Sequence, residues 1–327
     1  MRLTNGRVSH RQTTIDGLDA FADAVGFYLR LSPRQLPSRL LYDRLGTSLF
    51  DAICHLPWYG ITRAELRLLE LHARDIGRVL GPRARVVELG SGNGDKLAAL
   101  LSRAEVARVH AHLIDLSGAA LERSGRTLAA LEGLDLDVTG HEATYEDGLL
   151  ALKGLPRQPT LVAFLGSNIG NFDPPGATAF LGLIRSALQT CDYLLLGADL
   201  VKPERDLLLA YDDPLGVTAA FNKNLLLRIN TELGGDFVLE RFAHRAVWNA
   251  AVSRVEMHLV SLARQHASID RCDLGFTLET GEPIWTESSY KYQPETIVAL
   301  VESAGFAQRA QWVDAEGRFA LTLFEAA

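Results

Sequence analysis

Val86-Val87-Glu88-Leu89 is a short run that begins with β-branched residues and leads into Gly90-Ser91-Gly92-Asn93-Gly94, and the helical stretch Lys96–Leu101 follows. A strand that breaks into a glycine loop and continues as a helix is typical of the first unit of a nucleotide-binding α/β domain. Glycines at such a turn let the backbone approach a ligand closely, and the start of the helix offers free N–H groups. This stretch therefore predicts both a fold class and a ligand site.

Beyond this loop, apolar runs of strand length alternate with stretches of helical texture. The expected strands are 111–114, 134–138, 160–165 and 193–196, and the expected helices between them are 119–131 and 177–189. Alternation at this spacing indicates βαβ units and therefore a mostly parallel, doubly wound sheet. A helix at 294–303 precedes strand-like stretches at 311–313 and 319–324, which complete the sheet in this prediction.

Other parts of the chain lie outside that alternation. Residues 16–31 and 63–80 have the apolar spacing of helices, which Ser32-Pro33 and Gly81-Pro82 would end. Within 203–290, stretches such as 253–262 alternate apolar and polar residues, which indicates antiparallel strands with one wet face. The α/β domain is therefore expected to comprise 63–201 and 292–327, and a second domain to comprise 1–62 and 202–291.

The spacing of the glycine loop bears on the ligand. A dinucleotide fingerprint reads GxGxxG, whereas this loop reads GxGxG and has Asp95 where the third glycine should fall. A carboxylate there disfavours a pyrophosphate and an NAD-dependent oxidoreductase, and suits S-adenosylmethionine, whose sulfonium and amino group are cationic. The next strand ends in Asp115, 21 residues after Gly94, where a carboxylate accepts both hydroxyls of a ribose. The simpler interpretation is that Glu88 and Asp115 are merely polar residues at strand ends.

Composition excludes several classes of protein. Of the 327 residues 47% are apolar and 22% charged, so a disordered or fibrous chain is ruled out. Lys and Arg number 33 against 40 Asp and Glu, and the resulting net charge of −7 argues against a surface that coats nucleic acid. No apolar run approaches the roughly 20 residues that span a bilayer. We expect a monomer with neither nucleic-acid nor membrane partners.

Cysteine and histidine usage gives no sign of a metal centre. Cys54, Cys191 and Cys272 are far apart and form no CxxC pair, so we expect reduced, buried thiols in a cytoplasmic protein. The N-terminal residues MRLTNGRVSHRQTT contain no apolar segment of a signal peptide. The nine histidines form no HExxH or other clear metal spacing, and no GxSxG motif is present.

Further motifs resemble one family in order and spacing, from about Ser32 to the C-terminus. They are Leu41-Tyr42-Asp43 with Gly46, Leu56-Pro57-Trp58-Tyr59, Thr62-Arg63, Val87–Gly92, Phe164–Asn171, Leu196–Lys202, Ala210–Asp213 running into Gly216–Asn222, Val247-Trp248-Asn249, Arg254–Met257, and Thr286–Ser289 with Lys291. Together they resemble the histidine Nα-methyltransferases of ergothioneine biosynthesis, a histidine-specific family that uses S-adenosylmethionine. The resemblance implies a Rossmann-like, doubly wound methyltransferase domain with a second, smaller α+β substrate-binding domain.

The resemblance also implies a reaction and a set of site residues. Three successive methyl groups would pass from S-adenosylmethionine to the α-amine of L-histidine, giving hercynine and S-adenosylhomocysteine, with no metal. The implied cofactor-binding residues are Tyr42, Gly90, Gly92, Lys96, Asp115, Thr144 and Tyr145. The implied substrate-binding residues are Tyr59, Asn171, Tyr211, Met257, Glu287 and Ser289, of which Tyr59, Asn171 and Tyr211 are also assigned as catalytic.

These residue types suit the chemistry. Methyl transfer is an in-line displacement, so the protein mainly positions the nucleophile and excludes water. The amine must be neutral to attack, and Tyr59 and Asn171 orient its lone pair without adding charge, with Asn171 and Tyr211 also on the substrate carboxylate. A carboxylate beside the amine would favour its ammonium form. Glu287, with Ser289, instead accepts an imidazole N–H and reads the side chain.

Two departures from the family pattern leave alternatives open. Gly60 and Ile61 stand where the family usually has a second tyrosine and a proline, and Thr144 stands where an acidic residue beside adenine is expected. The alternatives are an Nα-methyltransferase of another amino acid, such as a tryptophan derivative, and a sensor that binds S-adenosylmethionine without turnover. Taken singly, Tyr59 resembles a core aromatic, Asn171 a turn residue, Tyr211-Asp212-Asp213-Pro214 an exposed turn, and Glu287 a solvated strand residue.

Overall fold

The computed structural model describes residues 16–327, which divide into two compact units. The first unit contains Gly60–Val201 and Lys291–Ala327, and the second contains residues 16–59 and Lys202–Tyr290. Residues 1–15, which the sequence pattern assigns to the second domain, lie outside the described residues.

A seven-stranded sheet forms the centre of the first unit, in the order β11-β12-β5-β4-β1-β2-β3. The strands are β1 (Arg83–Leu89), β2 (Arg108–Asp115), β3 (Asp135–Glu142), β4 (Thr160–Phe164), β5 (Tyr193–Asp199), β11 (Phe306–Asp314) and β12 (Phe319–Ala326). Strands β1 to β5 pair in parallel, and β12 pairs antiparallel with both β5 and β11. The predicted doubly wound sheet, completed by two C-terminal strands, is confirmed.

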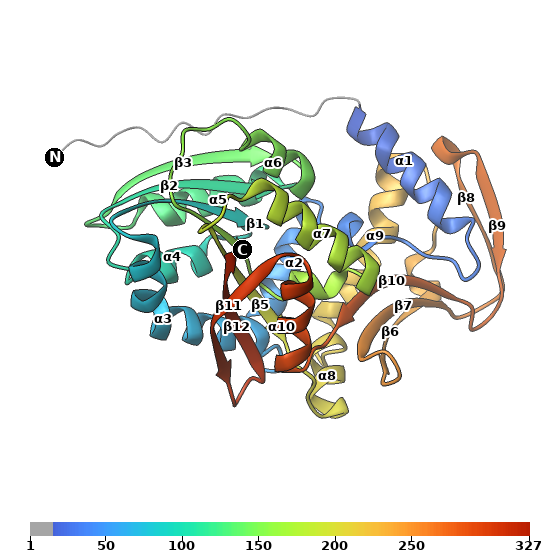
Figure 1. The fold of residues 1–327 in the computed structure, drawn as a ribbon. Coiled ribbons are helices and arrows are strands. Elements are labelled where there is room, and N and C mark those ends of the chain that lie inside the picture. Colours follow the sequence, from blue (N-terminus) through green and yellow to red (C-terminus); the bar gives the residue numbers. More distant parts are fainter. Residues whose placement is uncertain (1–15) are drawn as a thin grey trace. The chain divides into compact units, whose positions relative to one another are not determined.

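Helices cover both faces of this sheet (Figure 1). One group of mutually contacting helices comprises α3 (Ile61–Leu80), α4 (Asp95–Leu101) and α5 (Gly118–Ala129). The other comprises α6 (Tyr145–Ala151), α7 (Pro174–Ala187) and α10 (Pro294–Ser303). Because both faces are covered, β1 and β4 are buried along nearly their whole length, and β4 appears in the sequence as an almost continuous apolar run.

The strand order reverses between β1 and β4, since the chain moves outward from β1 to β2 and β3 and then returns to the other side of β1. In open α/β sheets, ligands bind at the carboxyl ends of the strands at such a switch point. The glycine loop follows β1, and the short 3₁₀ helix η2 (Asn168–Asn171) follows β4, so both lie at this edge.

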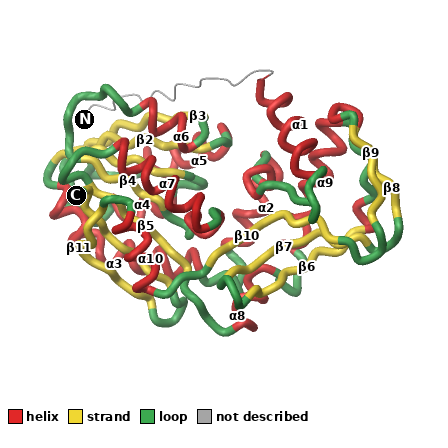
Figure 2. Tube along the Cα trace, turned by 45° about the vertical axis from the view of Figure 1, so that its right-hand side comes forward, coloured by secondary structure: helices red, strands yellow, loops and turns green. Residues whose placement is uncertain are grey.

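The second unit is built on a three-stranded antiparallel sheet, which Figure 2 shows as strands running side by side. Its strands, in spatial order, are β10 (Pro283–Tyr290), β7 (Arg254–Ser261) and β6 (Phe242–Asn249), and a separate pair is formed by β8 (Gln265–Ile269) and β9 (Leu274–Leu278). The helices are α1 (Asp16–Leu29), η1 (Ser38–Leu41), α2 (Arg44–Cys54), α8 (Glu204–Tyr211), α9 (Val217–Leu233), η3 (Leu239–Arg241) and η4 (Asp270–Cys272). The antiparallel strands confirm the prediction, whereas α8 and α9 were not anticipated.

The three cysteines are free, as expected, but the prediction that all are buried is wrong. Cys191 is exposed, and Cys54 and Cys272 are half-buried. Cys191 lies in the surface turn between α7 and β5, where the backbone adopts a positive φ of 67°. A turn of this kind leaves its side chains in solvent.

Candidate functional site

The glycine loop of the first unit has the geometry of a ligand cradle. Gly90 has a φ of 80°, and a Cβ placed on it would lie 2.8 Å from the Tyr145 hydroxyl and 3.1 Å from Asn168 Nδ2. A side chain here would meet both unfavourable backbone geometry and close contacts. The loop therefore keeps its backbone bare where the start of α4 offers N–H groups to a ligand.

Two carboxyl groups border this loop. Glu88, at the end of β1, is 2% exposed, and among the described residues its Oε2 has no hydrogen-bond partner. Burial raises the pKa of Glu88 to about 8, an effect that the Lys96 ammonium opposes, so the side chain is mostly neutral at pH 7. A buried acceptor without a protein partner fits a ligand that brings donor groups or positive charge.

Asp115 ends β2 at the same edge. Its Oδ2 accepts a hydrogen bond from Gly92 N at 3.2 Å, and its Oδ1 accepts one from Ser117 N at 2.9 Å. Burial raises the pKa of Asp115, while the backbone N–H groups oppose that shift. The bonds fix the carboxylate beside the glycine loop, at the position predicted for binding a ribose.

A third carboxylate, which the sequence reasoning missed, holds Lys96. Glu65 on α3 is fully buried, and its two oxygens accept the Gly166 N–H at 2.8 and 2.9 Å. Lys96 Nζ lies 2.8 Å from Glu65 Oε2. A Cβ on Gly197 would fall 2.0 Å from Glu65 Oε1, so the glycine of β5 makes room for the carboxylate. Glu65 thus joins α3, α4, β5 and the loop after β4 beneath the cradle.

The remaining candidate residues of the first unit are Thr144 and Tyr145 at the start of α6 and Asn171 at the end of η2. Thr144 is exposed and caps α6, because its Oγ1 accepts the Asp147 N–H at 3.1 Å. Tyr145 packs its ring at 5.7 Å from Phe164 and 5.6 Å from Phe180, and burial raises the pKa of its hydroxyl. Asn171 is half-buried and ends η2. The cap explains a threonine at position 144 without any ligand.

In the second unit, the candidate tyrosines form one aromatic cluster. The ring centroids of Tyr42 and Phe50 are 5.5 Å apart, those of Phe50 and Tyr59 6.2 Å, and those of Tyr59 and Tyr211 6.5 Å. The Tyr211 hydroxyl donates to Ser289 Oγ at 2.8 Å. Tyr42, predicted with the cofactor-binding residues, thus lies in the unit that carries the predicted substrate residues other than Asn171.

The interpretation of 211–214 as an exposed turn holds for Asp212 and Pro214, which are exposed, but is wrong for the other two residues. Tyr211 ends α8 and is 9% exposed, while Asp213 is buried. The Asp213 carboxylate accepts backbone N–H groups of Leu215, Val217 and Thr218 at the start of α9, and these bonds lower its pKa against the opposing effect of burial. Asp213 therefore caps the start of α9, because the unpaired N–H groups at the start of a helix attract a carboxylate.

The strand pair β7 and β10 brings three more candidates to one face. Glu287 lies directly opposite Met257, and Ser289 directly opposite Val255. Residues opposite one another on paired strands point to the same side of a sheet, and so do residues two apart. Met257 and Ser289 are buried and Glu287 is half-buried, so a carboxylate, a hydroxyl and a thioether share this face.

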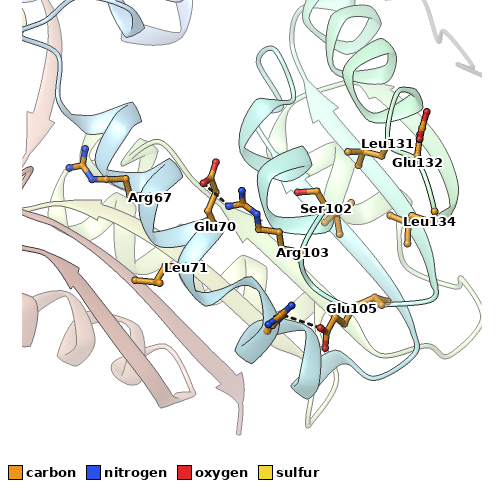
Figure 3. Close-up of a pocket in the computed structure, with 13 residues that line it drawn as sticks. Arg67, Glu70, Leu71, Ser102, Arg103, Glu105, Leu131, Glu132 and Leu134 are labelled. Carbon is orange, nitrogen blue, oxygen red and sulfur yellow. Dashed lines mark ion pairs between the residues drawn. The ribbon is translucent and has the colours of Figure 1, made fainter.

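A groove of about 740 Å³ lies elsewhere on the first unit, lined by α3 and by the loops that precede β2 and β3 (Figure 3). Four of its charged side chains form two ion pairs: Arg103 lies 2.6 Å from Glu70, and Arg74 lies 2.9 Å from Glu105. No predicted site residue lines it. The groove is at the amino ends of the strands, opposite the edge where α/β sheets bind ligands, so we do not take it as the catalytic site.

Comparison with known proteins decides the family. Residues 21–326 match the profile of a family described as histidine-specific, SAM-dependent methyltransferases. The chain belongs to this methyltransferase family. The chain is 39% identical over 298 residues to the histidine N-alpha-methyltransferase of Mycolicibacterium smegmatis, covering 90% of this chain and 91% of that protein.

Two further relatives widen the comparison. The histidine N-alpha-methyltransferase of Mycobacterium tuberculosis is 36% identical, covering 90% of this chain and 91% of that protein. The L-tryptophan methyltransferase of Psilocybe serbica is 28% identical, covering 88% of this chain and 87% of that protein. The family match confirms a methyltransferase that uses S-adenosylmethionine, with the Rossmann-like sheet described above.

Two residues at which this methyltransferase departs from its family pattern, Gly60 and Ile61, lie at the start of α3. Gly60 is the N-cap residue of α3, and a Cβ placed on it would meet nothing within 4 Å. Ile61 begins α3 and is 2% exposed. The open space at Gly60 is where a larger family residue would stand.

The helical spacing of the sequence of this methyltransferase already indicates that Glu65 is buried. It lies four residues after Ile61 and four before Leu69, both buried, and therefore on the apolar stripe of α3. A carboxylate at such a position is buried and needs a partner.

Two kinds of feature are absent from residues 16–327. No group of three or more His, Cys, Asp or Glu side chains there is placed to hold a metal ion. No helix in that part of the chain is long and apolar enough to cross a membrane.

Proposed function

We propose that this methyltransferase transfers methyl groups from S-adenosylmethionine to the α-amine of L-histidine in three successive steps, giving hercynine, the first intermediate of ergothioneine biosynthesis. One observation carries the choice of substrate. Glu287 and Ser289 share a sheet face with buried Met257, and Ser289 is bonded to Tyr211. A carboxylate among buried side chains selects a side chain that donates an N–H, as imidazole does.

The cofactor would be held by residues of the first unit. The bare backbone of Gly90 and Gly92 fits a closely approaching ligand, Lys96 offers an ammonium to its carboxylate, and Asp115 offers acceptors to its ribose. S-adenosylmethionine supplies, when bound, an electrophilic methyl group on its sulfonium. The protein residues contribute position and an environment with few competing waters.

The substrate would be held by neutral groups at its amine. In this assignment Tyr59, Asn171 and Tyr211 orient the amine and carboxylate by hydrogen bonds. Because none of the three carries a charge at neutral pH, they leave the ammonium form without the support that a carboxylate would give. The Glu287 carboxyl group is assigned to the imidazole end of the molecule.

Replacing Asp115 with alanine is expected to weaken cofactor binding by about 1.5–3 kcal/mol, since hydrogen bonds to a charged group contribute about this much. Titration calorimetry of the folded variant with S-adenosylhomocysteine measures the loss. Asp137→Ala is the matched control, because Asp137 is an exposed carboxylate on the neighbouring strand β3. Equal affinity of the wild type and of Asp115→Ala for S-adenosylhomocysteine would show that Asp115 does not bind the ribose.

The reaction rate is expected to rise with pH. The free α-amine of histidine is largely protonated at neutral pH and must lose its proton before it attacks, and no protein carboxylate is assigned as its base. At subsaturating histidine, the initial rate should therefore climb from about pH 7 to about pH 9. S-adenosylhomocysteine release in a buffer series measures this, and a flat profile would indicate a dedicated base or a different rate-limiting step.

We also propose that the protein acts in the cytoplasm as a monomer without nucleic-acid partners. The three free thiols support a reducing compartment. The net charge of −7 supports the absence of nucleic acid.

A further inference from the structure

The face on which Glu287 lies depends on one extra residue in β10. Trp285 is opposite His258 of β7, but Glu287 is opposite the next residue, Met257. Two steps along β10 therefore match one step along β7, and Thr286 is the additional residue of a β-bulge. We infer that this bulge, fixed by the side chains of Trp285 and Thr286, positions Glu287 for substrate recognition. The inference rests on the function proposed above.

The bulge changes which residues of β7 lie opposite Glu287 and Ser289. In an unbroken ladder, Glu287 would stand opposite Glu256 and Ser289 opposite Arg254. A shift of one residue moves every later side chain to the other face of a sheet. Glu287 would then lie beside Glu256, which already pairs with Arg254, and would leave the face of Met257. The bulge therefore brings the carboxylate and the Ser289 hydroxyl to the Tyr211 side of the sheet.

Two side-chain hydrogen bonds hold the bulge. The Trp285 indole Nε1–H donates to the Glu287 carbonyl oxygen at 2.8 Å, which spans the extra residue. The Thr286 hydroxyl, 1% exposed, donates to the Met257 carbonyl oxygen at 3.0 Å. Both bonds satisfy carbonyl groups at the bulge, where the regular ladder is interrupted.

The ring of Trp285 is itself fixed from the other face of the sheet. The Arg254 guanidinium lies 4.4 Å from the centroid of the Trp285 ring, and its Nη1 donates to the Tyr290 hydroxyl at 2.7 Å. The backbone of Trp285 is held too, because its N–H donates to the Arg34 carbonyl and its own carbonyl accepts from Leu36 N. Trp285 is thus a rigid positioning residue, not a group that touches substrate.

The test removes the two bonds and keeps the packing. Trp285→Phe loses the N–H but keeps a ring under Arg254, and Thr286→Val loses the hydroxyl but keeps the shape. The double variant is expected to lower kcat/KM for histidine about tenfold, mainly through KM, as two hydrogen bonds together predict. Its affinity for S-adenosylhomocysteine should be unchanged. Ser288→Ala, a neighbouring change on the Trp285 side of the strand, is the matched control.

A double-mutant cycle separates positioning from general stability. In a Glu287→Gln background, the Trp285→Phe and Thr286→Val changes should alter kcat/KM less than about twofold, because the group they position is already lost. A tenfold loss that persists in that background would overturn the inference. So would wild-type kcat/KM in the double variant.

A second measurement reads the bulge without turnover. The Trp285 indole proton, followed by nuclear magnetic resonance with labelled tryptophan, should exchange slowly with solvent and faster once Thr286 is changed to valine. Fast exchange in the wild type would contradict the bulge lock. Failure of the wild type to methylate histidine would instead contradict the proposed function, and slow exchange would still support the lock.

Discussion

Glu287→Ala is expected to lower kcat/KM for histidine by about 2–4 kcal/mol, equivalent to a loss of about 30- to 1,000-fold. The half-buried carboxylate shares a face with buried Met257, so a substrate that donates an N–H to it forms a hydrogen bond at this face. A site built to hydrogen-bond a substrate N–H strongly rejects analogues that lack this donor. The variant should therefore also accept apolar aromatic amino acids better than the wild type does.

Competition between histidine and tryptophan, followed by product masses, measures both effects of the Glu287 change. Glu279→Ala is the control, since Glu279 is exposed in the turn before β10 and pairs only at the surface with Arg264. A Glu287→Ala variant that keeps the wild-type preference for histidine would show that Glu287 is a solvated strand residue. The substrate assignment would then lose its main support.

Glu65→Ala is expected to destabilise the fold by about 2–4 kcal/mol, somewhat less than the cost of removing one partner of a fully buried charged pair, because the Lys96 side chain is 24% exposed. Glu65 is fully buried and holds both Lys96 and the Gly166 N–H. Truncation leaves these donors without the carboxylate and opens a cavity beside Gly197. Urea unfolding measures the change in the free energy of unfolding.

Glu70 supplies the matched control for Glu65 on the same helix. It pairs with Arg103 at 2.6 Å, but both side chains are about half exposed, at 47% and 52%. An exposed pair contributes at most about 1 kcal/mol, so Glu70→Ala should cost no more than that. If the two variants unfolded at the same urea concentration, Glu65 would not be the anchor beneath the glycine loop.

The parallel sheet was predictable because burial on both faces leaves a simple pattern. Strands such as β4 and β5 are almost entirely apolar, and glycine or a carboxyl group follows where they end. The same regularity predicts that the glycine loop and Asp115 lie at one edge of the sheet, and the structure places them there.

Helix α9 was missed because its sequence does not separate into apolar and polar faces. Asn222 and Asn224 are buried, and each has a specific partner: Asn222 Nδ2 lies 2.9 Å from His244, and Asn224 donates to Asp43 at 2.8 Å. Buried polar residues break the helical periodicity on which the prediction depends. Their partners are distant in sequence and cannot be found by spacing.

The face occupied by Glu287 was also beyond sequence reasoning. Strict alternation from Trp285 would place Glu287 on the Trp285 side, and nothing in Trp285-Thr286-Glu287 marks an inserted residue. The bulge depends on hydrogen bonds that exist only in the folded sheet. Motif resemblance named Glu287, whereas the register explains how it comes to share a face with Met257.

One measurement tests the central claim most directly. The wild-type protein is incubated with S-adenosylmethionine and an equimolar mixture of the twenty amino acids, and the products are read by mass spectrometry. The account predicts that histidine is consumed first and that the product carries three added methyl groups on its α-nitrogen. Preferential methylation of tryptophan, or cofactor binding with no methylated amino acid at all, would contradict it.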